Sequence, residues 1–514
     1  MKYVPKRYED LRKRVETMSL DALLDAVVCP IYVLPEEPKR TTSAVMFAAT
    51  DVKTSLATIE KVNEGREDKA LLTADFEFGC GQSAKGAVTF PSMRAVREAG
   101  DETLAYEMGA AAAKEGRLAG YHWAFGPCTD ILINHRNPIV SIRSAGETAA
   151  DVIRFTGAYM RGMQDNGMIA TLKHFPGDGV ASDDQHVTTT ENPLSREEWD
   201  ASFGLVYKTL IEDGAKAVMP GHIALPSYDE IDPETGLYPP ATASKNLLTK
   251  LLREKLGFEG IIISDAVGMS GLSGYVEFYH ASARFLEAGG DCLLFMPANE
   301  EYREAMKKEI GRGTLRVETL KNRAFRMLCF SREYFESNSG PISFDRQKAE
   351  ALSEEIVKRS VKVIRDRNSV LPLSASDVRK IYHVILPNQG VVQGIKDAKD
   401  LSVQLEERGF SVTEAVDPGC GAILEAVKSG QYDLVVCSVV TPASYGTNTI
   451  KLSGPMTRNM MDGWMKRGVP TVFIAYQDPY FHEDFRASAD TVINTYGFAG
   501  STNRYIIRTL FGEP

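Results

Sequence analysis

Residues 171–186, TLKHFPGDGVASDDQH, place charged groups directly after an apolar run. Lys173 and His174 end that run, a Pro-Gly turn and a glycine-containing loop follow, and Asp184 stands two residues before His186. Charged groups at the end of a buried strand are costly unless they bind or react with something. At the C-terminal end of a barrel strand, that role is usually substrate binding or catalysis.

The pair Asp184 and His186 has the residue types of an acid–base catalyst. If the loop is not helical, the carboxylate reaches the imidazole, fixes its tautomer and gives an acid or base that works near neutral pH. Taken alone, such a pair is more often part of a solvated polar loop. It also offers two metal ligands, but no third and fourth ligand stand at motif spacing, so we predict no metal.

Two further positions carry chemistry. Asp265 directly follows the apolar run GIIIS, which suits a nucleophile or a base because the carboxylate is desolvated on one side. The alternative is a helix N-cap, for which Asp is a favoured residue. The ammonium group of Lys173 has several hydrogen-bond donors, which suit sugar hydroxyls. The alternative interpretation is that Lys173 forms a buried ion pair with a neighbouring carboxylate.

The elements that position these groups alternate between strand and helix from about residue 25 to 330. This alternation predicts a parallel (β/α)8 TIM-like barrel, with a doubly wound open sheet as the alternative. The expected strands are 70–75, 122–131, 168–175, 215–223, 260–265 and 291–296. Polar residues close five of them, namely Asp75, Asp130, Lys173 with His174, His222 and Asp265. Polar groups delivered to one end by five strands favour the barrel.

The remainder of the chain predicts a second, smaller domain. Residues 336–348 are rich in turn formers and indicate a linker. A helical segment follows over 347–366, and then strands at 381–387, 433–440, 471–476 and 490–497 are separated by helical patterns. We therefore expect a barrel over 1–335, the linker over 336–348 and an α/β/α sandwich over 349–514.

Composition narrows the function classes. The 514 residues are 43% apolar and 25% charged, and the net charge of −10 indicates neither nucleic acid nor a membrane surface as a partner. The first residues lack the apolar region of a signal peptide, and no apolar run approaches the ~18 residues of a membrane span. Seven cysteines without a CxxC pair indicate free thiols in a reducing compartment, so we expect a cytoplasmic protein.

Several segments together resemble glycoside hydrolase family 3, and within it the β-N-acetylglucosaminidase branch. KHFPGDG (173–179), DQH (184–186) and SDA (264–266) are similar to the family's KHFPGHG, D-x-H and SDD segments. TADFEFG, NPIVSIRS (137–144) and AVMPGHIALP (217–226) resemble further family segments. The resemblance covers most of residues 20–330, and the second domain fits the sandwich that many members carry.

The resemblance implies a role for each matching residue. Asp265 is the implied nucleophile, and His186, oriented by Asp184 on a loop that closes over the site, is the implied acid–base. The residues implied to hold the sugar hydroxyls are Asp75, Arg143, Lys173 and His174. No cofactor is implied. Departures from the pattern are Asp178 in place of histidine, Ala266 in place of aspartate, and Cys80 with Ser83 in place of a glycine-arginine segment.

The sequence therefore predicts a retaining exo-β-N-acetylglucosaminidase that acts on a small oligosaccharide or glycopeptide from cell wall or chitin. A phosphorylase on the same scaffold and a β-glucosidase of the same family are the alternatives. An alternative from a different functional class is a sugar-binding protein without catalytic activity. A nucleotide-binding oxidoreductase is disfavoured because the glycine cluster 78–86 lacks the spacing of a nucleotide fingerprint. The second domain either walls the pocket or mediates a homodimer.

Overall fold

The computed structural model describes residues 8–33, 41–48, 50–388, 393–442, 452 and 454–513. The chain divides into two compact units. The first comprises Met1–Thr89, Glu102–Asn137 and Gly146–Ala349, and the second comprises Phe90–Asp101, Pro138–Ala145 and Glu350–Pro514. Two short segments from the first third of the chain thus belong to the second unit. The contiguous boundaries at 335, 336–348 and 349 stay a prediction.

The first unit is a closed parallel barrel, which confirms the predicted fold. Its strands are β1 (Val28–Cys29) continued by β2 (Ile31–Tyr32), β3 (Ala44–Phe47), β5 (Leu71–Ala74), β7 (Trp123–Ala124), β8 (Thr171–Phe175), β10 (Ala217–Pro220), β12 (Ile261–Ile262) and β13 (Leu293–Leu294). Parallel pairing runs β2–β3–β5–β7 and β8–β10–β12, and β13 pairs with β1. Single bridges, Trp123 to Ile169 and Ile263 to Cys292, close the ring between these groups.

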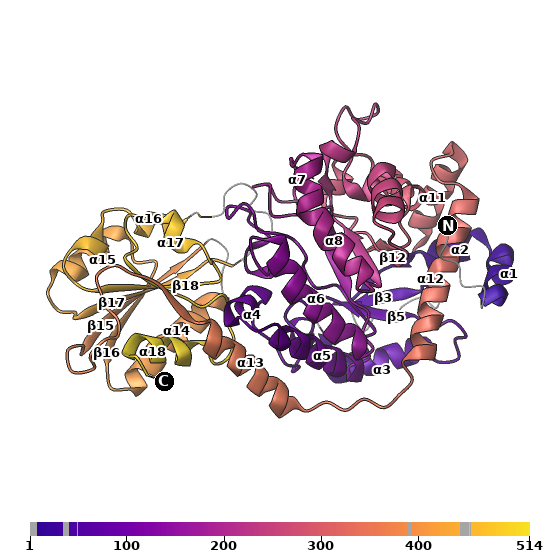
Figure 1. Ribbon diagram of the computed structural model, residues 1–514. Helices are drawn as coiled ribbons and strands as arrows, with labels where there is room; N and C mark the ends of the chain where they lie inside the picture. Colours follow the sequence, from indigo (N-terminus) through magenta and orange to yellow (C-terminus); the bar gives the residue numbers. More distant parts are fainter. Residues whose placement is uncertain are drawn as a thin grey trace. The chain divides into compact units, whose positions relative to one another are not determined.

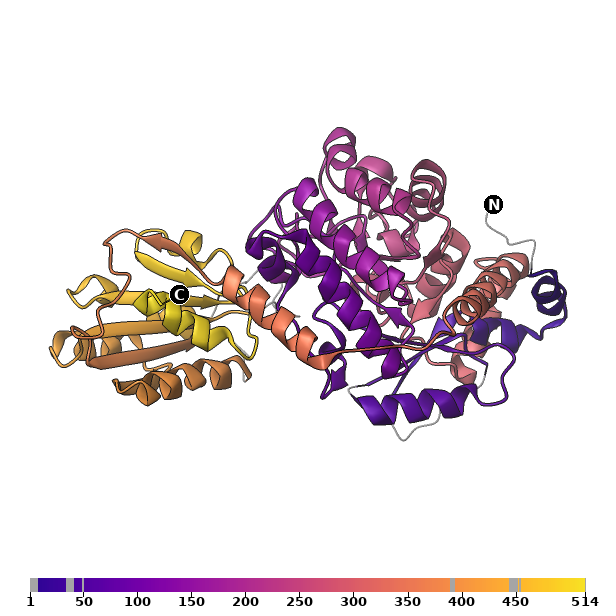
Figure 2. The same cartoon turned by 60° about the horizontal axis from the view of Figure 1, so that its bottom comes forward.

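Helices cover the outside of the barrel (Figure 1). They are α3 (Val52–Asn63), α5 (Glu102–Leu118), α6 (Ala149–Asp165), α7 (Arg196–Ala201), α8 (Phe203–Glu212), η6 (Asn246–Lys255), α10 (Phe278–Ala288), α11 (Glu300–Arg312) and α12 (Val317–Ser337). In both views α1 (Glu9–Thr17) and α2 (Leu20–Ala26) lie beside α12 (Figure 2). The N-terminal segment therefore packs against the last helix of the barrel.

Glycine allows α5 and α6 to pack backbone against backbone. A Cβ atom on Gly109 would lie 2.3 Å from the carbonyl oxygen of Tyr159, and one on Gly162 would lie 2.1 Å from that of Tyr106. Real Cβ atoms do not approach backbone atoms so closely, so a larger residue at either position forces the helices apart. The α6 helix itself begins at a Thr148 N-cap, whose hydroxyl accepts from the backbone N–H of Asp151 at 3.1 Å.

The second unit is a six-stranded sheet between two helical layers, as predicted. Its strand order is β14–β19–β18–β17–β15–β16, with only β14 antiparallel to its neighbour. The strands are β14 (Lys362–Asp366), β15 (Lys380–Pro387), β16 (Ser411–Val416), β17 (Leu434–Val440), β18 (Thr471–Tyr476) and β19 (Thr491–Asn494). In Figure 1 α15 (Cys420–Lys428), α16 (Pro455–Asn459) and α17 (Phe481–Asp484) lie on one face, and α14 (Gln393–Glu407) and α18 (Thr502–Phe511) lie on the other.

One sequence expectation about this unit was wrong. The helix expected over 347–366 ends early, because α13 spans Arg346–Ser360 and the following residues form β14. The edge of β19 offers backbone partners to this segment, which pairs with it from Lys362 to Asp366. Tertiary pairing thus overrides a local pattern that is compatible with a helix.

Candidate active site

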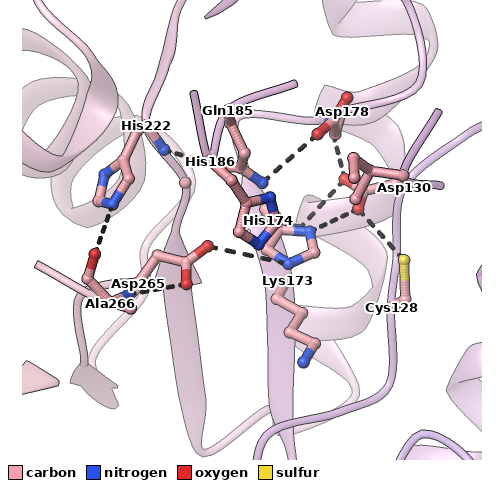
Figure 3. A network of polar contacts seen from close by, with 12 residues as sticks. Cys128, Asp130, Lys173, His174, Asp178, Gln185, His186, His222, Asp265 and Ala266 are labelled. Carbon is pink, nitrogen blue, oxygen red and sulfur yellow. Dashed lines mark hydrogen bonds and ion pairs between the residues drawn. The ribbon is translucent and has the colours of Figure 1, made fainter. Parts of the chain in front are cut away.

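The polar residues at the strand ends gather at one end of the barrel. Lys173 and His174 lie in β8, and Asp265 follows β12 by three residues. His222 follows β10, between it and the short strand β11 (Ile223–Ala224). Because parallel strands of a barrel end at the same face, the side chains of His174, His222 and Asp265 come together, while that of Lys173 points away from them (Figure 3).

His174 lies between two carboxylates (Figure 3). Its Nδ1 is 2.7 Å from Oδ2 of Asp130, and its Nε2 is 3.9 Å from Oδ2 of Asp265. The other oxygen of Asp130 accepts backbone N–H groups from His174 at 3.1 Å and Asp178 at 2.7 Å. Burial raises the pKa of Asp130, but the charge and hydrogen bond of His174, together with hydrogen bonds from Asp178 and Cys128, hold it below its ordinary value. Asp130 therefore fixes the imidazole so that Nε2 points at Asp265.

Asp265 has the electrostatics of an ionised nucleophile. Its Oδ1 accepts from the backbone N–H of Ala266 at 2.8 Å, and its side chain is 14% exposed. Burial raises its pKa, but the imidazoles of His174, His222 and His186 and the N–H of Ala266 together hold it below its ordinary value. The carboxylate is therefore held in its charged form with limited contact to water, as nucleophilic attack requires.

Asp184 and His186 form the pair that the sequence predicted. Oδ1 of Asp184 is 2.6 Å from Nδ1 of His186 and also accepts the backbone N–H of His186 at 2.8 Å. Asp184 is fully buried, whereas the imidazole is 29% exposed. With Nδ1 committed to the carboxylate, proton exchange with a substrate falls to Nε2.

The loop that carries this pair is docked on the barrel. The carbonyl oxygen of His186 accepts from the backbone N–H of Ser270 at 3.1 Å, and that of His222 accepts from Thr190 at 3.2 Å. The strand β9 (Thr190–Glu191) then pairs in parallel with β11. The chain following β10 and the short helix α9 (Ser270–Ser273) thus hold the loop where the acid–base pair meets the strand ends.

Lys173 is a buried ion-pair partner. Its Nζ is 2.9 Å from Asp75 and 2.7 Å from Glu77, and its side chain is 5% exposed. Glu77 is equally buried, so Asp75, at 39% exposed, is the partner that faces outward. Lys173 therefore orients Asp75. Sequence reasoning missed Glu77, although its place two residues after Asp75 in ADFEFG was a usable signal.

Arg143 lies in one of the short segments assigned to the second unit. It ends the helical turn η3 (Ser141–Arg143) in the segment Pro138–Ala145, which packs with the second unit. Its guanidinium donates to the carbonyl oxygen of Ile139 at 3.4 Å. A role of Arg143 in holding sugar stays a prediction.

One group among the described residues has the chemistry of a metal site. The thiol of Cys128, a carboxylate oxygen of Asp130 and a ring nitrogen of His174 lie within 4.8 Å of one another. Hydrogen bonds already join these atoms, since the thiol donates to Asp130 at 3.2 Å. A thiolate, a carboxylate and an imidazole would suit zinc, with the thiol and imidazole protons displaced. The prediction that no metal is needed stays a prediction.

A separate cavity of about 350 Å³ lies at the opposite end of the barrel. Its lining comes from the chain just before β10 and β12, including Lys216 and Phe258, and from the C-terminal half of α12 with Asn338 after it. Positions at the amino ends of barrel strands usually serve stability. The acid–base groups therefore place the candidate active site at the carboxyl ends.

The barrel and the sandwich unit agree with what known proteins show. Residues 42–329 match the family described as "Glycosyl hydrolase family 3 N terminal domain". The chain belongs to glycoside hydrolase family 3 and is a glycosidase. None of the described helices combines the length and the apolar character that crossing a bilayer requires.

One relative and two solved structures cover most of the chain, and a second relative covers about a third of it. A beta-N-acetylglucosaminidase/beta-glucosidase of Cellulomonas fimi is 30% identical over 496 residues, which cover 91% of this chain and 86% of that protein. A beta-hexosaminidase of Stenotrophomonas maltophilia is 37% identical over 185 residues, which cover 35% of this chain and 51% of that protein. A beta-glucoside phosphorylase structure has a TM-score of 0.89 at 26% identity and covers 99% and 94% of the two chains. A beta-N-acetylglucosaminidase from Paenibacillus sp. shares the fold, with a TM-score of 0.81 at 23% identity and 97% coverage of both chains.

Proposed function

We propose that the protein is a retaining exo-β-N-acetylglucosaminidase that releases terminal N-acetylglucosamine from cell-wall or chitin-derived oligosaccharides or glycopeptides. The observation that carries the proposal is the combination of an ionised carboxylate, Asp265, with a separate imidazole–carboxylate pair, His186 and Asp184. The imidazole is close enough to Asp265 to help lower its pKa. A nucleophile and a proton donor at one barrel end are what a two-step glycosidase needs.

In the proposed reaction, a carboxylate oxygen of Asp265 attacks the anomeric carbon and forms a glycosyl–enzyme ester. The imidazolium of His186 gives its proton from Nε2 to the leaving oxygen, so the aglycone departs as an alcohol. The neutral imidazole then takes a proton from water, which attacks the anomeric carbon and releases Asp265. Two inversions give net retention. Asp184 steadies the imidazolium, while Asp75, oriented by Lys173, holds sugar hydroxyls together with His174.

The test is turnover of p-nitrophenyl β-N-acetylglucosaminide and p-nitrophenyl β-glucoside. We expect the acetamido sugar to be preferred, because the Stenotrophomonas relative is named a beta-hexosaminidase and the name of the Cellulomonas relative includes the N-acetylglucosaminide beside the glucoside. Asp265→Asn should abolish turnover of both sugars. Asp184→Asn should lower it strongly, whereas Asp183→Asn, the same change one residue earlier, should not. An active Asp265→Asn protein would refute the mechanism, and a folded but inactive wild type that binds the sugar would favour a silent sugar-binding protein.

A phosphorylase is the second candidate, because the proposed acid–base is an imidazole. A neutral imidazole does not repel phosphate as a carboxylate would, so phosphate can replace water as the acceptor of the glycosyl group. The likeness to a beta-glucoside phosphorylase over nearly the whole chain supports this candidate. Release of a sugar 1-phosphate and a faster reaction in phosphate buffer would favour it over hydrolysis.

Two further expectations accompany this proposal. All seven cysteines are free thiols, and six of them are buried, which supports a reducing, cytoplasmic location. A homodimer stays a prediction, and light scattering on the purified protein tests it directly.

A further inference from the structure

Gln185 stands between Asp184 and His186, and its side chain is fully buried. Its Oε1 accepts the backbone N–H of His222 at 2.8 Å, and its Nε2 donates to Oδ2 of Asp178 at 3.4 Å. The amide therefore connects the acid–base loop to the ends of β10 and β8 at once (Figure 3). Because one side of the amide only accepts and the other only donates, these two partners fix its orientation.

The carboxylate of Asp178 faces three hydrogen-bond donors. Oδ1 accepts from Nδ2 of Asn137 at 2.8 Å and from the backbone N–H of Gly179 at 2.6 Å, while Oδ2 accepts from Gln185. An ionised carboxylate is an acceptor at both oxygens, so it satisfies all three. An amide at this position would turn an N–H group toward one of the donors.

Glycine makes room for Gln185. A Cβ atom on Gly221 would lie 2.6 Å from Oε1 of Gln185, and one on Gly271 would lie 2.2 Å from its carbonyl oxygen. The chain that follows β10 and the helix α9 thus approach Gln185 as closely as a backbone can. Gly221 thus lies against the side-chain amide and Gly271 against the backbone of the same residue, while the two polar partners fix how the amide is oriented.

We propose that Gln185 and Asp178 are positioning residues that form a latch and hold the acid–base pair against the strand ends. The proposal rests on the proposed role of His186. Neither latch residue touches the substrate; each acts through the loop backbone, which places the imidazole over the glycosidic oxygen. General acid catalysis depends on that placement. Loosening the latch should therefore slow proton donation to the leaving group more than it weakens sugar binding.

The decisive experiment exchanges the two functional groups of the latch. In Asp178→Asn the new N–H group faces one of the donors that the carboxylate accepted from. In Gln185→Glu the new carboxylate faces that of Asp178. The double variant, Asp178→Asn with Gln185→Glu, keeps the net charge and restores every pairing in reverse: the amide at 178 donates to the new carboxylate at 185, whose other oxygen accepts from His222. Burial and the charge of Asp130 raise the pKa of Asp178 to about 6, so assays run at pH 7.5, where it is an acceptor.

The readout is kcat/KM for glycosides with a good leaving group, 2,4-dinitrophenol, and a poor one, 4-methylumbelliferone or a sugar. Loss of an acid catalyst matters most for poor leaving groups. For glycosides with a poor leaving group, kcat/KM of each single variant should therefore fall about tenfold to a hundredfold, and for the dinitrophenyl glycoside it should change little. The double variant should regain most of the loss. Equal losses on both substrates, or a double variant as poor as the worse single one, would overturn the latch.

His186→Ala separates this proposal from the function on which it rests. If His186→Ala loses activity mainly on poor leaving groups while the latch variants do not, the acid–base role stands and the latch is wrong. If His186→Ala shows no leaving-group dependence, the proposed function itself fails. Thermal unfolding of each variant identifies a fold defect, and rescue by the double variant supports the latch even where a single variant is unstable.

Discussion

His383 predicts a pH-dependent stability of the second unit. It lies fully buried in β15, with Nδ1 2.6 Å from the hydroxyl of Ser402 and Nε2 2.8 Å from that of Ser438. Burial lowers its pKa from 6.5 to about 4, against a smaller raising effect of Glu414. Because the unfolded chain binds the proton more readily, this group favours the folded state above pH 6.5, and that preference is lost as the pH falls toward 4. This lowering of the pKa corresponds to about 3 kcal/mol of stability, of which about 2 kcal/mol is lost by pH 5.0.

His383→Gln isolates this effect, because glutamine can hydrogen-bond to the serines but does not titrate. The free energy of unfolding, measured by urea titration at pH 7.5 and 5.0, should fall by about 2 kcal/mol less in the variant than in the wild type. His135→Gln, the same change in the barrel, serves as the control. An equal fall in His383→Gln and the wild type would refute the reasoning.

Three further predictions follow from the barrel. His174→Gln removes the largest influence that lowers the pKa of Asp265, so the acid limb of the kcat/KM profile should move to higher pH, and an unmoved limb would contradict this assignment. Lys173→Met leaves the carboxylates of Asp75 and Glu77 without a cation. Calorimetry should show a loss of about 3–5 kcal/mol in stability together with weaker sugar binding. Retained stability would show that the ion pairs of Lys173 do not stabilise the fold. Gly162→Ala should destabilise the protein by at least about 2 kcal/mol in urea unfolding, because its Cβ atom meets the backbone of α5, whereas Gly311→Ala on an open face of α11 should be neutral or stabilising by about 1 kcal/mol.

The sequence predicted the architecture because five of the six expected barrel strands are short apolar runs with a polar residue at the end. Asp75, Lys173 and Asp265 all follow that rule, and the structure brings all three to the carboxyl ends of the strands. The segments β1 and β3 were not among the expected strands. They pair with β13 and β5, which lie far from them in the sequence or beyond a helix.

The contacts within the site could not be predicted in the same way. That Lys173 is shared between Asp75 and Glu77, or that Asp130 turns the ring of His174, depends on which strand ends become neighbours. The burial of Gln185 depends on two glycines in other segments. Side-chain partners of this kind follow from tertiary packing, which spacing along one chain does not encode.

The most direct test of the account is to trap the covalent intermediate. A 5-fluoro glycosyl fluoride of N-acetylglucosamine should inactivate the enzyme, and mass spectrometry of its peptides should place one sugar on the peptide that contains Asp265. The account predicts a single ester at that carboxylate and no labelling of Asp265→Asn. Inactivation with the sugar on another carboxylate, or turnover of substrate with inversion at the anomeric carbon, would contradict it.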